Sequence, residues 1–454
     1  MAKTDKNKII FPLLALIAIV LAPKVFSEIL ERCNTKFCIR YRNSIERSKA
    51  DGEKWNFKKE RIVSGWHVID KDVINADKYL FDYLSRETWG LPGGYIESIN
   101  QDILFGTNGR GEVFLYSFSQ NKFKVVNSNL HDIYKEQMFE KYVKLPFGQV
   151  GQFGIKDIYL DREKQDMFAS ITKNVSGDGC YGMAIYKANL NKLDFQNVDK
   201  FFYMKFKEYF QTTICNRNFN GHRTGGRIKK YKDQIIFTVG DLGISLNKEN
   251  SGAIIPKKKK NIIGQVLSIN EKGESSLISS GHRNPQGLEI LGDRILVTEH
   301  GPQGGDEINL IKMNNPKKNK NYGWPLYVYG FSYQDTLRFR FPHEGDFIDP
   351  IHYFTPSIGI SEITLYDNNH FPFWNNKLIL TSLNYSSIYI MDFDQKDEMF
   401  KSVEKIPIGH RIRDIETLPN GEIVIITDDQ KIIKLKRSRK DTISFDSTDL
   451  YKYK

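Results

Sequence analysis

Cysteine is scarce in this sequence, and the cysteine motifs that bind metals are missing. The 454 residues contain four cysteines, Cys33, Cys38, Cys180 and Cys215, with neither CxxC spacing nor a nearby histidine pattern. A zinc site is therefore disfavoured, and disulfide bonds formed in an oxidising compartment are the better interpretation. Cys33 and Cys38 could close a small loop while Cys180 and Cys215 tie a long insertion to the fold. Three pairings are possible, however, and the sequence does not choose among them.

The apolar run near the N-terminus is short for a membrane span. Residues 9–23 are apolar without interruption and lie between lysines, whereas a span needs about 20 residues. This length suits the apolar region of a secretory signal, although no Ala-x-Ala cleavage site follows. We expect residues 1–27 to be a signal peptide or a membrane anchor. The protein would then be periplasmic or otherwise extracytoplasmic, tethered to the inner membrane through residues 9–23 if that segment is not cleaved.

Acidic residues are outnumbered, and the net charge is +11. Much of the excess lies in lysine- and arginine-rich runs at residues 257–260, 317–318 and 436–440. A nucleic-acid-binding surface would need these charges interleaved with aromatic residues on one face. Runs of this kind in expected loops are more typical of solvated surface, so no nucleic-acid partner is predicted. An anionic substrate, cofactor or lipid surface stays compatible with the charge.

A short sequence pattern recurs along the chain and predicts the fold. A polar turn precedes a short β-branched or aromatic run, and a threonine closes it. The closing residues are Thr107, Thr172, Thr238, Thr298, Thr381 and Thr427. Such short strands cannot bury a face alone, so repeated units must pack radially or stack. We predict an all-β, six-bladed β-propeller, in preference to a jelly roll or sandwich, which would not need the same pattern at similar intervals.

Helices are expected only as insertions between the strands. Residues 132–143 and 198–210 have helix-like spacing of aromatic and aliphatic side chains. The predicted organisation is a signal or anchor at 1–27, an extension carrying Cys33 and Cys38 at 28–89, the propeller at 90–436 and a charged tail at 437–454.

Two loop motifs, residues 281–287 and 299–309, concentrate chemistry in one part of the chain. They contain Arg283 and Asn284, then Asp306 and Glu307, with glycines throughout, and a strand at 291–297 is expected between them. Propeller sites form where loops from successive blades meet at one end of the channel. The mixture of cationic, amide, acidic and glycine-backbone groups suits a site that holds an anion and a hard cation.

Four motifs in order carry a resemblance to a known family. They are GHRNPQG at 281–287, EHGPQGGDEINL at 299–310, NYGWP at 321–325 and HRIRD at 410–414. With these motifs the chain resembles the soluble quinoprotein glucose/sorbosone dehydrogenases over roughly residues 90–430. The resemblance implies a six-bladed propeller that binds pyrroloquinoline quinone (PQQ) and Ca²⁺. It also implies oxidation of an aldose at its anomeric hydroxyl by hydride transfer to the quinone; the sugar and the electron acceptor stay open.

The resemblance also assigns roles by position. The residues implied to contact PQQ are Gln152, Arg283, Asn284, Arg411 and Arg413. Carbonyl groups of Gly301 and Pro302 would ligate calcium, and Asp306 and Glu307 would brace that loop or supply a further calcium site. His222 would be the general base, and Arg283 would stabilise charge on the reduced quinone.

The sequence departs from the family pattern at three places. Alignment without a gap puts Arg223 at the position of the base, with His222 one residue early. Asn384 stands where the family has a lysine, and the family's tryptophan that lines the cofactor falls near Thr355, with aromatics only at the neighbouring Tyr353 and Phe354. A propeller with weakened or no catalysis, which binds a sugar, another envelope ligand or a protein partner, is therefore the alternative.

Several of these residues also have purely structural interpretations. Arg283 and Arg413 could form ion pairs between blades, and Gln152 could satisfy a turn. His282 and His300 are better read as hydrogen-bonded loop residues than as ligands.

Overall fold

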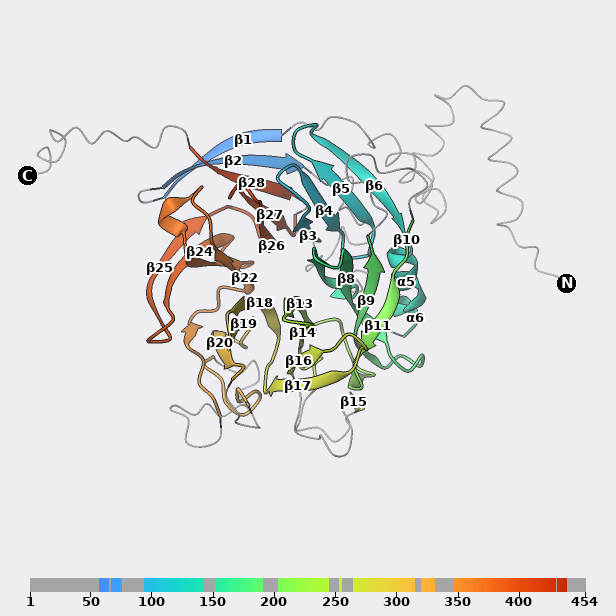
Figure 1. The fold of residues 1–454 in the computed structure, drawn as a ribbon. Coiled ribbons are helices and arrows are strands. Elements are labelled where there is room, and N and C mark those ends of the chain that lie inside the picture. Colours follow the sequence, from blue (N-terminus) through green and yellow to red (C-terminus); the bar gives the residue numbers. More distant parts are fainter. Residues whose placement is uncertain are drawn as a thin grey trace, which may run out of the picture. The chain divides into compact units, whose positions relative to one another are not determined.

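The computed structural model describes residues 57–64, 67–75, 94–142, 152–190, 203–244, 253–254, 264–314, 320–330, 347–429 and 431–438. Within these ranges six sheets stand in a ring around a central channel, which confirms the predicted six-bladed β-propeller (Figure 1). Residues 1–27, the Cys33 and Cys38 pair and most of the charged tail lie outside the described residues. No helix in the described ranges is both long and apolar enough to cross a membrane.

Each blade begins at the channel and runs outward. The first blade has β3 (Tyr95–Ser98), β4 (Ile103–Thr107), β5 (Val113–Ser117) and β6 (Lys122–Ser128). The second blade has β7 (Ile155–Asp161), β8 (Asp166–Asn174) and β9 (Tyr181–Asn189). The third blade has β13 (Gly225–Tyr231), β14 (Gln234–Val239), β16 (Gln265–Ile269) and β17 (Ser275–Ser280). The fourth has β18 (Pro285–Leu291), β19 (Arg294–Glu299), β20 (Asp306–Lys312) and β21 (His352–Phe354); the fifth has β22 (Ile360–Tyr366), β23 (Lys377–Ser382), β24 (Ser387–Asp394) and β25 (Met399–Pro407), with a 3-10 turn η4 (Pro372–Trp374). The sixth contains β26 (Ile412–Thr417), β27 (Ile423–Thr427) and β28 (Lys431–Arg437).

The repeated threonines all lie on the second strand of a blade and are fully buried. In three blades the hydroxyl accepts a hydrogen bond from the first strand: Thr172 from the Gly154 amide at 2.7 Å, Thr238 from the Arg227 amide at 2.9 Å and Thr381 from the Glu362 amide at 2.8 Å. In each of these blades the first strand has a β-bulge close to the bonded amide. A bulge leaves a backbone group without its ladder partner, and the threonine hydroxyl replaces that partner. The repeat therefore marks where the inner strands bend.

The sixth blade is completed by the N-terminal part of the chain. Strands β1 (Phe57–Ser64) and β2 (His67–Asn75) form a hairpin, and β2 pairs antiparallel with β28, so the sheet order is β1-β2-β28-β27-β26. The predicted boundary at residue 90 is thus wrong for these strands, which belong to the propeller sheet. Pairing supplies the outer edge of the last blade with hydrogen-bond partners that an extension would have left in solvent.

An insertion after the second blade forms strands where a helix was expected. Residues 203–210 contain β10 (Tyr203–Met204), which pairs with β6, and most of β11 (Lys207–Gln211), which pairs with β9. The predicted helix at 198–210 is therefore wrong in its described part, because pairing with exposed strand edges outweighs the local spacing. The other predicted helix is confirmed, as α5 (Leu130–Glu136) and α6 (Phe139–Tyr142).

One disulfide ties this insertion to the second blade. Cys180 precedes β9 and bonds to Cys215, which begins β12 (Cys215–Asn216), itself paired with β15 (Ala253–Ile254). Both cysteines are buried, which confirms one of the pairings that the sequence left open. The disulfide thus fixes the 35-residue separation that contains β10 and β11.

Removal of this disulfide is expected to destabilise the fold measurably. Closing a loop of this length reduces the entropy of the unfolded chain, so the Cys180→Ala/Cys215→Ala variant should lose about 2–4 kcal/mol of unfolding free energy. Urea unfolding with and without a reductant measures this. If the variant unfolds at the same urea concentration as the oxidised wild-type protein, the disulfide has no stabilising role.

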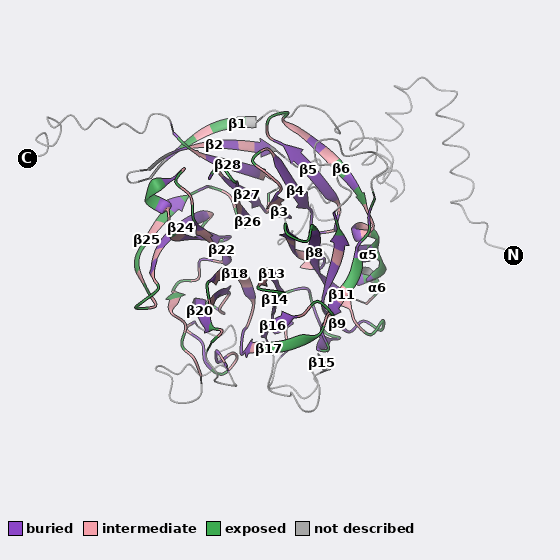
Figure 2. Ribbon diagram, viewed as in Figure 1, coloured by how far each residue is buried: buried purple, intermediate pink, exposed green. Residues whose placement is uncertain are grey.

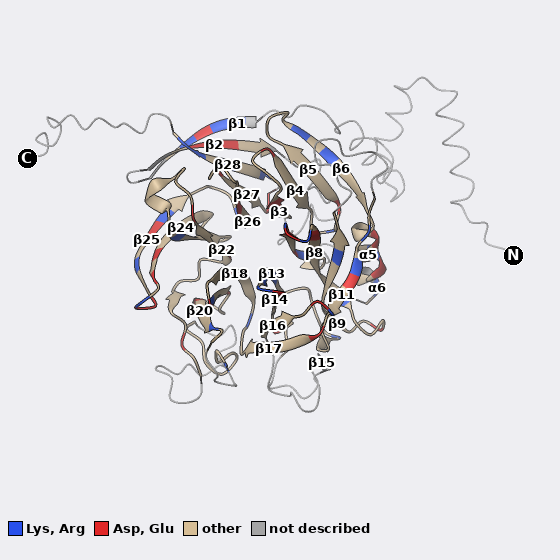
Figure 3. Cartoon of the chain, in the orientation of Figure 1, with Lys and Arg blue, Asp and Glu red and all other residues tan. Residues whose placement is uncertain are grey.

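Burial follows the radial order of the strands (Figure 2). The second strands β14, β19, β23 and β27 are almost wholly buried, whereas β25 at the rim of the fifth blade is mostly exposed. Charged residues gather on outer strands such as β1, β11 and β25, and they also occur on inner strands that face the channel (Figure 3). Since a charge is costly to bury without a partner, the inner ones must be paired.

Candidate functional site

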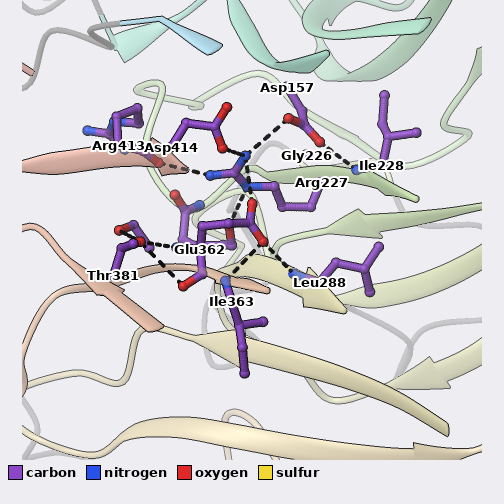
Figure 4. A network of polar contacts seen from close by, with 12 residues as sticks. Asp157, Gly226, Arg227, Ile228, Leu288, Glu362, Ile363, Thr381, Arg413 and Asp414 are labelled. Atoms are coloured by element: carbon purple, nitrogen blue, oxygen red, sulfur yellow. Dashed lines mark hydrogen bonds and ion pairs between the residues drawn. The ribbon is translucent and has the colours of Figure 1, made fainter. Parts of the chain in front are cut away.

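A single arginine occupies the centre of the channel. Arg227, on β13, is 5% exposed, and its Nη1 lies 3.1 Å from Asp157, 2.8 Å from Glu362 and 2.8 Å from Asp414 (Figure 4). These carboxylates come from the inner strands of the second, fifth and sixth blades. The guanidinium also lies over the Tyr95 ring of the first blade, 5.2 Å from its centroid.

The same arginine holds two inner strands by their backbones. Arg227 Nε donates to the Gln286 carbonyl at 2.6 Å, and its Nη2 donates to the Arg413 carbonyl at 3.0 Å. The fourth blade is thereby joined to the same centre. One guanidinium at the centre of the channel thus contacts all five other blades.

Carboxylates outnumber cations at this centre, where Asp157, Glu362 and Asp414 surround one guanidinium. Burial raises the pKa of Glu362 to about 7, against the opposing effect of Arg227, and burial likewise raises the pKa of Asp157 well above its usual value. The neighbouring carboxylates add to both shifts. Several carboxyl groups compete for one guanidinium, so some of them are protonated at neutral pH.

Bulges at the start of the inner strands aim side chains at one end of the channel. The register skips one residue at Lys156 in β7, at Gln286 in β18 and at Arg413 in β26. A bulged residue falls out of the alternation of its strand and can redirect its side chain. Lys156 Nζ bonds the Gln152 carbonyl; burial, and next the charge of Arg413, lower the pKa of Lys156. We call the end of the channel where these residues lie the mouth.

The two loop motifs of the fourth blade meet at the mouth. They flank the whole β18–β19 hairpin and not a single strand, which corrects the expectation of one strand at 291–297. Because an antiparallel hairpin returns to its starting edge, both motifs reach the same end of the blade. Arg283 Nη1 donates to the His300 carbonyl at 3.1 Å, and the guanidinium lies over the Trp324 ring at 5.3 Å.

Asn284 links this blade to the third. Its Oδ1 accepts from the Gly225 amide at 3.2 Å and from Gln286 Nε2 at 3.0 Å.

The predicted calcium loop is a tight turn held by Asp306. One carboxylate oxygen accepts from the Gly301 amide at 3.1 Å, and the other accepts from the amides of Gly359 at 2.7 Å and Ile360 at 3.1 Å. Of the two roles predicted for Asp306, these bonds match bracing of the loop. A Cβ on Gly301 would overlap the carbonyl oxygens of Gly304 and Gly305, so glycine is needed there.

Glu307 is the next residue on β20 after Asp306. It is buried, pairs through Oε2 with Asn309 Nδ2 at 3.4 Å, and has a pKa raised by burial and by Glu299. In the described part of the chain no group of three or more His, Cys, Asp or Glu side chains is placed to hold a metal. The predicted ligands Gly301 and Pro302 would act through backbone carbonyls, and their role stays a prediction.

Arg411 and Arg413 share one carboxylate at the sixth blade. Asp428 accepts from Arg413 Nε at 2.8 Å and Nη2 at 2.9 Å, and it lies 3.3 Å from Arg411 Nε. The pair of Arg413 and Asp428 lies within one blade, unlike the inter-blade ion pair considered from the sequence. Arg411 also donates to the Leu383 carbonyl at 3.4 Å, next to the departure at Asn384, whose side chain is exposed.

The position predicted for the base is held by an ion pair. Arg223 has a positive φ of 61° and donates from Nη1 to Asp241 at 3.0 Å; Asp241 also accepts from Trp324 Nε1 at 2.8 Å. His222 is exposed, and its amide bonds Asn220 Oδ1 at 3.3 Å. Burial of its ring, then the charges of Lys156, Arg223 and Arg283, lower the pKa of His222. His222 thus lies at the mouth with a neutral ring at neutral pH.

The other predicted site residues are placed as follows. Gln152 lies at the mouth, where its carbonyl accepts from Lys156 Nζ. His282 is fully buried between Ser279 and Glu299, as expected for a loop histidine. Thr355, in the fourth blade, is exposed and donates to the Tyr329 carbonyl at 3.4 Å.

His300 shows a weaker match to the loop role. Burial lowers the pKa of His300, and the charge of Asp306 opposes this lowering. The charges of Arg283, Arg413 and Arg411 add to it. It therefore lies among the predicted cofactor arginines.

Sequence reasoning missed three mouth residues. Lys156 follows Gln152 by four positions, but only the bulge in β7 directs it to the mouth. Asp241 and Asp428 each directly follow a glycine or threonine that ends a strand motif, and that position was the available signal. Trp324 stood in a recognised motif without an assigned contact.

Comparisons with known proteins agree with this architecture. The aldose sugar dehydrogenase YliI of Escherichia coli strain K12 is 29% identical over 239 residues, which is 48% of this chain and 60% of that protein. The quinoprotein glucose dehydrogenase B of Acinetobacter calcoaceticus is 31% identical over 128 residues, 23% of this chain and 26% of that protein. The chain thus spans about half to three fifths of the length of the curated relatives that match over the longest stretches.

A solved structure shows the shared fold. The apo-form of the soluble aldose sugar dehydrogenase from Escherichia coli has a TM-score of 0.57 at 22% identity, covering 76% of this chain and 95% of that one. The model of the family described as glucose/sorbosone dehydrogenase matches residues 127–435, which is more than half of the sequence. The chain is therefore a member of the glucose/sorbosone dehydrogenase family.

Proposed function

We propose that this protein is an exported, PQQ- and calcium-dependent oxidoreductase that oxidises the anomeric hydroxyl of an aldose. The observation that carries the proposal is the surplus of cations at the mouth. Arg411 and Arg413 share the carboxylate of Asp428, Arg283 bonds the His300 carbonyl, and Lys156 bonds the Gln152 carbonyl. A ligand with several carboxylates would balance this charge. Family membership supports the same class of reaction, and the quinoprotein relative is named a glucose dehydrogenase.

The residues present fit PQQ by their chemistry. PQQ carries three carboxylates and an ortho-quinone, and guanidinium groups bind carboxylates with strong, paired hydrogen bonds. Gln152, Arg283, Asn284, Arg411 and Arg413 would hold it. The tight loop at Gly301 and Pro302 offers carbonyl oxygens, which are ligands that calcium accepts. When bound, the quinone supplies an acceptor for hydride, and calcium polarises it.

The protein's own groups bind the ligands and move the proton. Arg283, held over Trp324, is positioned to stabilise negative charge that develops on a bound ligand. Arg223 cannot accept a proton, since a guanidinium stays charged, and it is paired with Asp241. Of these two residues, only His222 has a side chain able to accept a proton, because its pKa is lowered and its ring is neutral at neutral pH.

The alternative function is a propeller that binds a ligand at this mouth with little or no catalysis. The ion pair of Arg223 with Asp241, at the position expected for the base, is the observation that favours it. The two functions differ in turnover and not in the fold.

Reconstitution separates them. Purified protein is incubated with PQQ and Ca²⁺, and reduction of a dye is followed after aldoses are added. The proposal expects dye reduction that depends on sugar, on PQQ and on calcium together. Saturable PQQ binding without any sugar-dependent reduction would instead establish the binding function.

Calcium dependence is expected to be sensitive to Gly301. In Gly301→Ala the Cβ would overlap the carbonyl oxygens of Gly304 and Gly305 and open the loop. We expect the calcium concentration for half-maximal activity to rise about tenfold or more, which is about 1.4 kcal/mol of binding free energy. Gly292→Ala is the matched control, because that glycine lies in a turn of the same blade with open space around it, so alanine adds backbone strain at a φ of 62° but no overlap with the loop. An unchanged calcium requirement in Gly301→Ala would contradict the assignment of the loop.

A further inference from the structure

We propose that Lys156 accepts the proton of the substrate's anomeric hydroxyl, with His222 in a secondary role. The inference rests on the proposed function, because it assigns a step of that reaction. It is carried by the position of Lys156 at the mouth, its contacts and the groups that surround it.

The bulge in β7 places Lys156 at the mouth. Ile155 pairs with Ile171 and Asp157 with Ser170, so Lys156 is the extra residue between them. Asp157 turns to Arg227 in the channel centre, and the bulge frees Lys156 from the strand's alternation. Gly226 has no side chain, and a Cβ there would overlap the Cβ of Lys156. The absence of that Cβ leaves room for the lysine stem beside the third blade.

The amine is half-buried and has a neutral hydrogen-bond partner. Lys156 Nζ donates to the Gln152 carbonyl, at the start of the same blade. That carbonyl orients an N–H without supplying a negative charge, so the bond does not require the protonated form. The carboxylates nearest along the inner strands, Asp157 and Asp414, are directed to Arg227.

The charge facing Lys156 is positive. Arg413 faces it from β26, whereas His222, in the loop before β13, has a neutral ring at neutral pH. Burial first, and then the charge of Arg413, lower the pKa of Lys156 to about 7. A substantial fraction of the amine is therefore neutral at neutral pH, with a lone pair that can take a proton. A lowered pKa near the working pH is the property that suits a lysine to general base catalysis.

His222 is less well fixed for the same task. The residue as a whole is exposed although its ring is partly buried, and its backbone amide bonds Asn220. A general base must stay within hydrogen-bond reach of the proton it removes. The bond to the Gln152 carbonyl fixes the position of the Lys156 amine at the mouth, whereas the bond from the His222 amide does not fix the His222 ring.

The step balances as follows. The O–H bond of the anomeric hydroxyl breaks, and its proton forms an N–H bond with the neutral Lys156 amine. The anomeric C–H bond breaks as well, and its hydride, with two electrons, passes to the bound ortho-quinone cofactor. The sugar becomes a lactone and the quinone is reduced. Lys156 is left protonated, as an ammonium group, and later releases its proton to solvent.

The first test needs no cofactor. Apoprotein is labelled with acetic anhydride across pH 6–11, and the rate at each lysine is followed by peptide mass spectrometry. Lys156 is expected to reach half its maximal rate near pH 7, since only the neutral amine reacts. Lys164 is the internal control, because it is exposed and its bond to Glu271 raises its pKa. Titration of Lys156 together with Lys164 would overturn the proposal.

The second test separates binding from proton transfer in the reconstituted protein. Lys156→Met and Lys156→Arg are each expected to lower kcat about 100-fold or more, because neither side chain can accept the proton. The rise of kcat/KM with pH near 7 should disappear in both. His222→Ala should lose less than about tenfold, and Lys164→Met should match the wild-type protein.

Three outcomes are informative. PQQ affinity retained with kcat lost in both Lys156 variants supports the assignment. Wild-type kcat in Lys156→Met, or a His222→Ala variant that alone loses about 100-fold, overturns it while the proposed function stands. A wild-type protein that binds PQQ but oxidises no sugar overturns both.

Discussion

Replacement of Arg227 by methionine is expected to lower the free energy of unfolding by about 3–5 kcal/mol. The variant would leave Asp157, Glu362 and Asp414 around an apolar group in the closed centre of the channel. It would also remove the donors to the Gln286 and Arg413 carbonyls, which hold two further strands. Breaking a buried ion pair from one side leaves uncompensated charge, and that is the physical reason for so large a loss. Urea unfolding followed by tryptophan fluorescence measures it.

The matched control is Arg162→Met. Arg162 also contacts carboxylates, Glu97 at 3.9 Å and Glu416 at 3.4 Å, but its side chain is 53% exposed. Exposed ion pairs contribute about 0–1 kcal/mol, so this variant should unfold close to the wild-type protein. Equal losses in the two variants would show that the central arginine is no more important to the ring than a surface one.

Replacement of Arg283 by methionine is expected to weaken PQQ binding about tenfold to a hundredfold with little change in stability. One charge-assisted hydrogen bond contributes about 1.5–3 kcal/mol, and a tenfold change in affinity is about 1.4 kcal/mol. Arg283 Nη1 bonds the His300 carbonyl, and the guanidinium lies over the Trp324 ring. Fluorescence titration with PQQ measures the affinity, and thermal unfolding measures the stability.

Arg217→Met serves as the control for Arg283→Met. Arg217 is exposed and pairs with Asp178 on the second blade, so its removal takes away one positive charge without touching the mouth. We expect PQQ affinity to stay within about twofold in this variant, since surface charges are screened by salt. The same loss of affinity in both variants would mean that general positive charge, and not the arginine at the mouth, holds the cofactor.

The number of blades could be predicted from the sequence because the repeat has a structural cause. Thr172, Thr238 and Thr381 accept from amides at bulges of the inner strands, so the same residue type recurs once in each of these blades. The two loop motifs of the fourth blade meet because they flank the β18–β19 hairpin, which the expected single strand did not include.

Other parts of the fold depend on partners distant in the chain. The pairing of β2 with β28 joins residues near position 70 to residues near 435, and nothing local to β2 signals it. The strands at 203–211 were misread as a helix because their aromatic spacing fits both structures, and the edge of β9 decided between them. The position of Lys156 at the mouth depends on a bulge that no local pattern marks.

The candidate site was predictable where it lay in contiguous motifs and not where single residues complete it. Arg283, Arg413 and Gly301 stand in recognisable motifs, and the structure brings them to one end of the channel. Arg227 received no role from the sequence, yet it holds the centre of the ring. Its role needs carboxylates from three other blades, which the sequence does not place together.

Binding of PQQ to the purified protein, with and without Ca²⁺, tests the central claim most directly. The cation-rich mouth predicts saturable binding of one PQQ per chain at micromolar concentration or below, and the loop at Gly301 predicts that calcium strengthens it. Absence of saturable binding at micromolar PQQ in the presence of calcium would contradict the account.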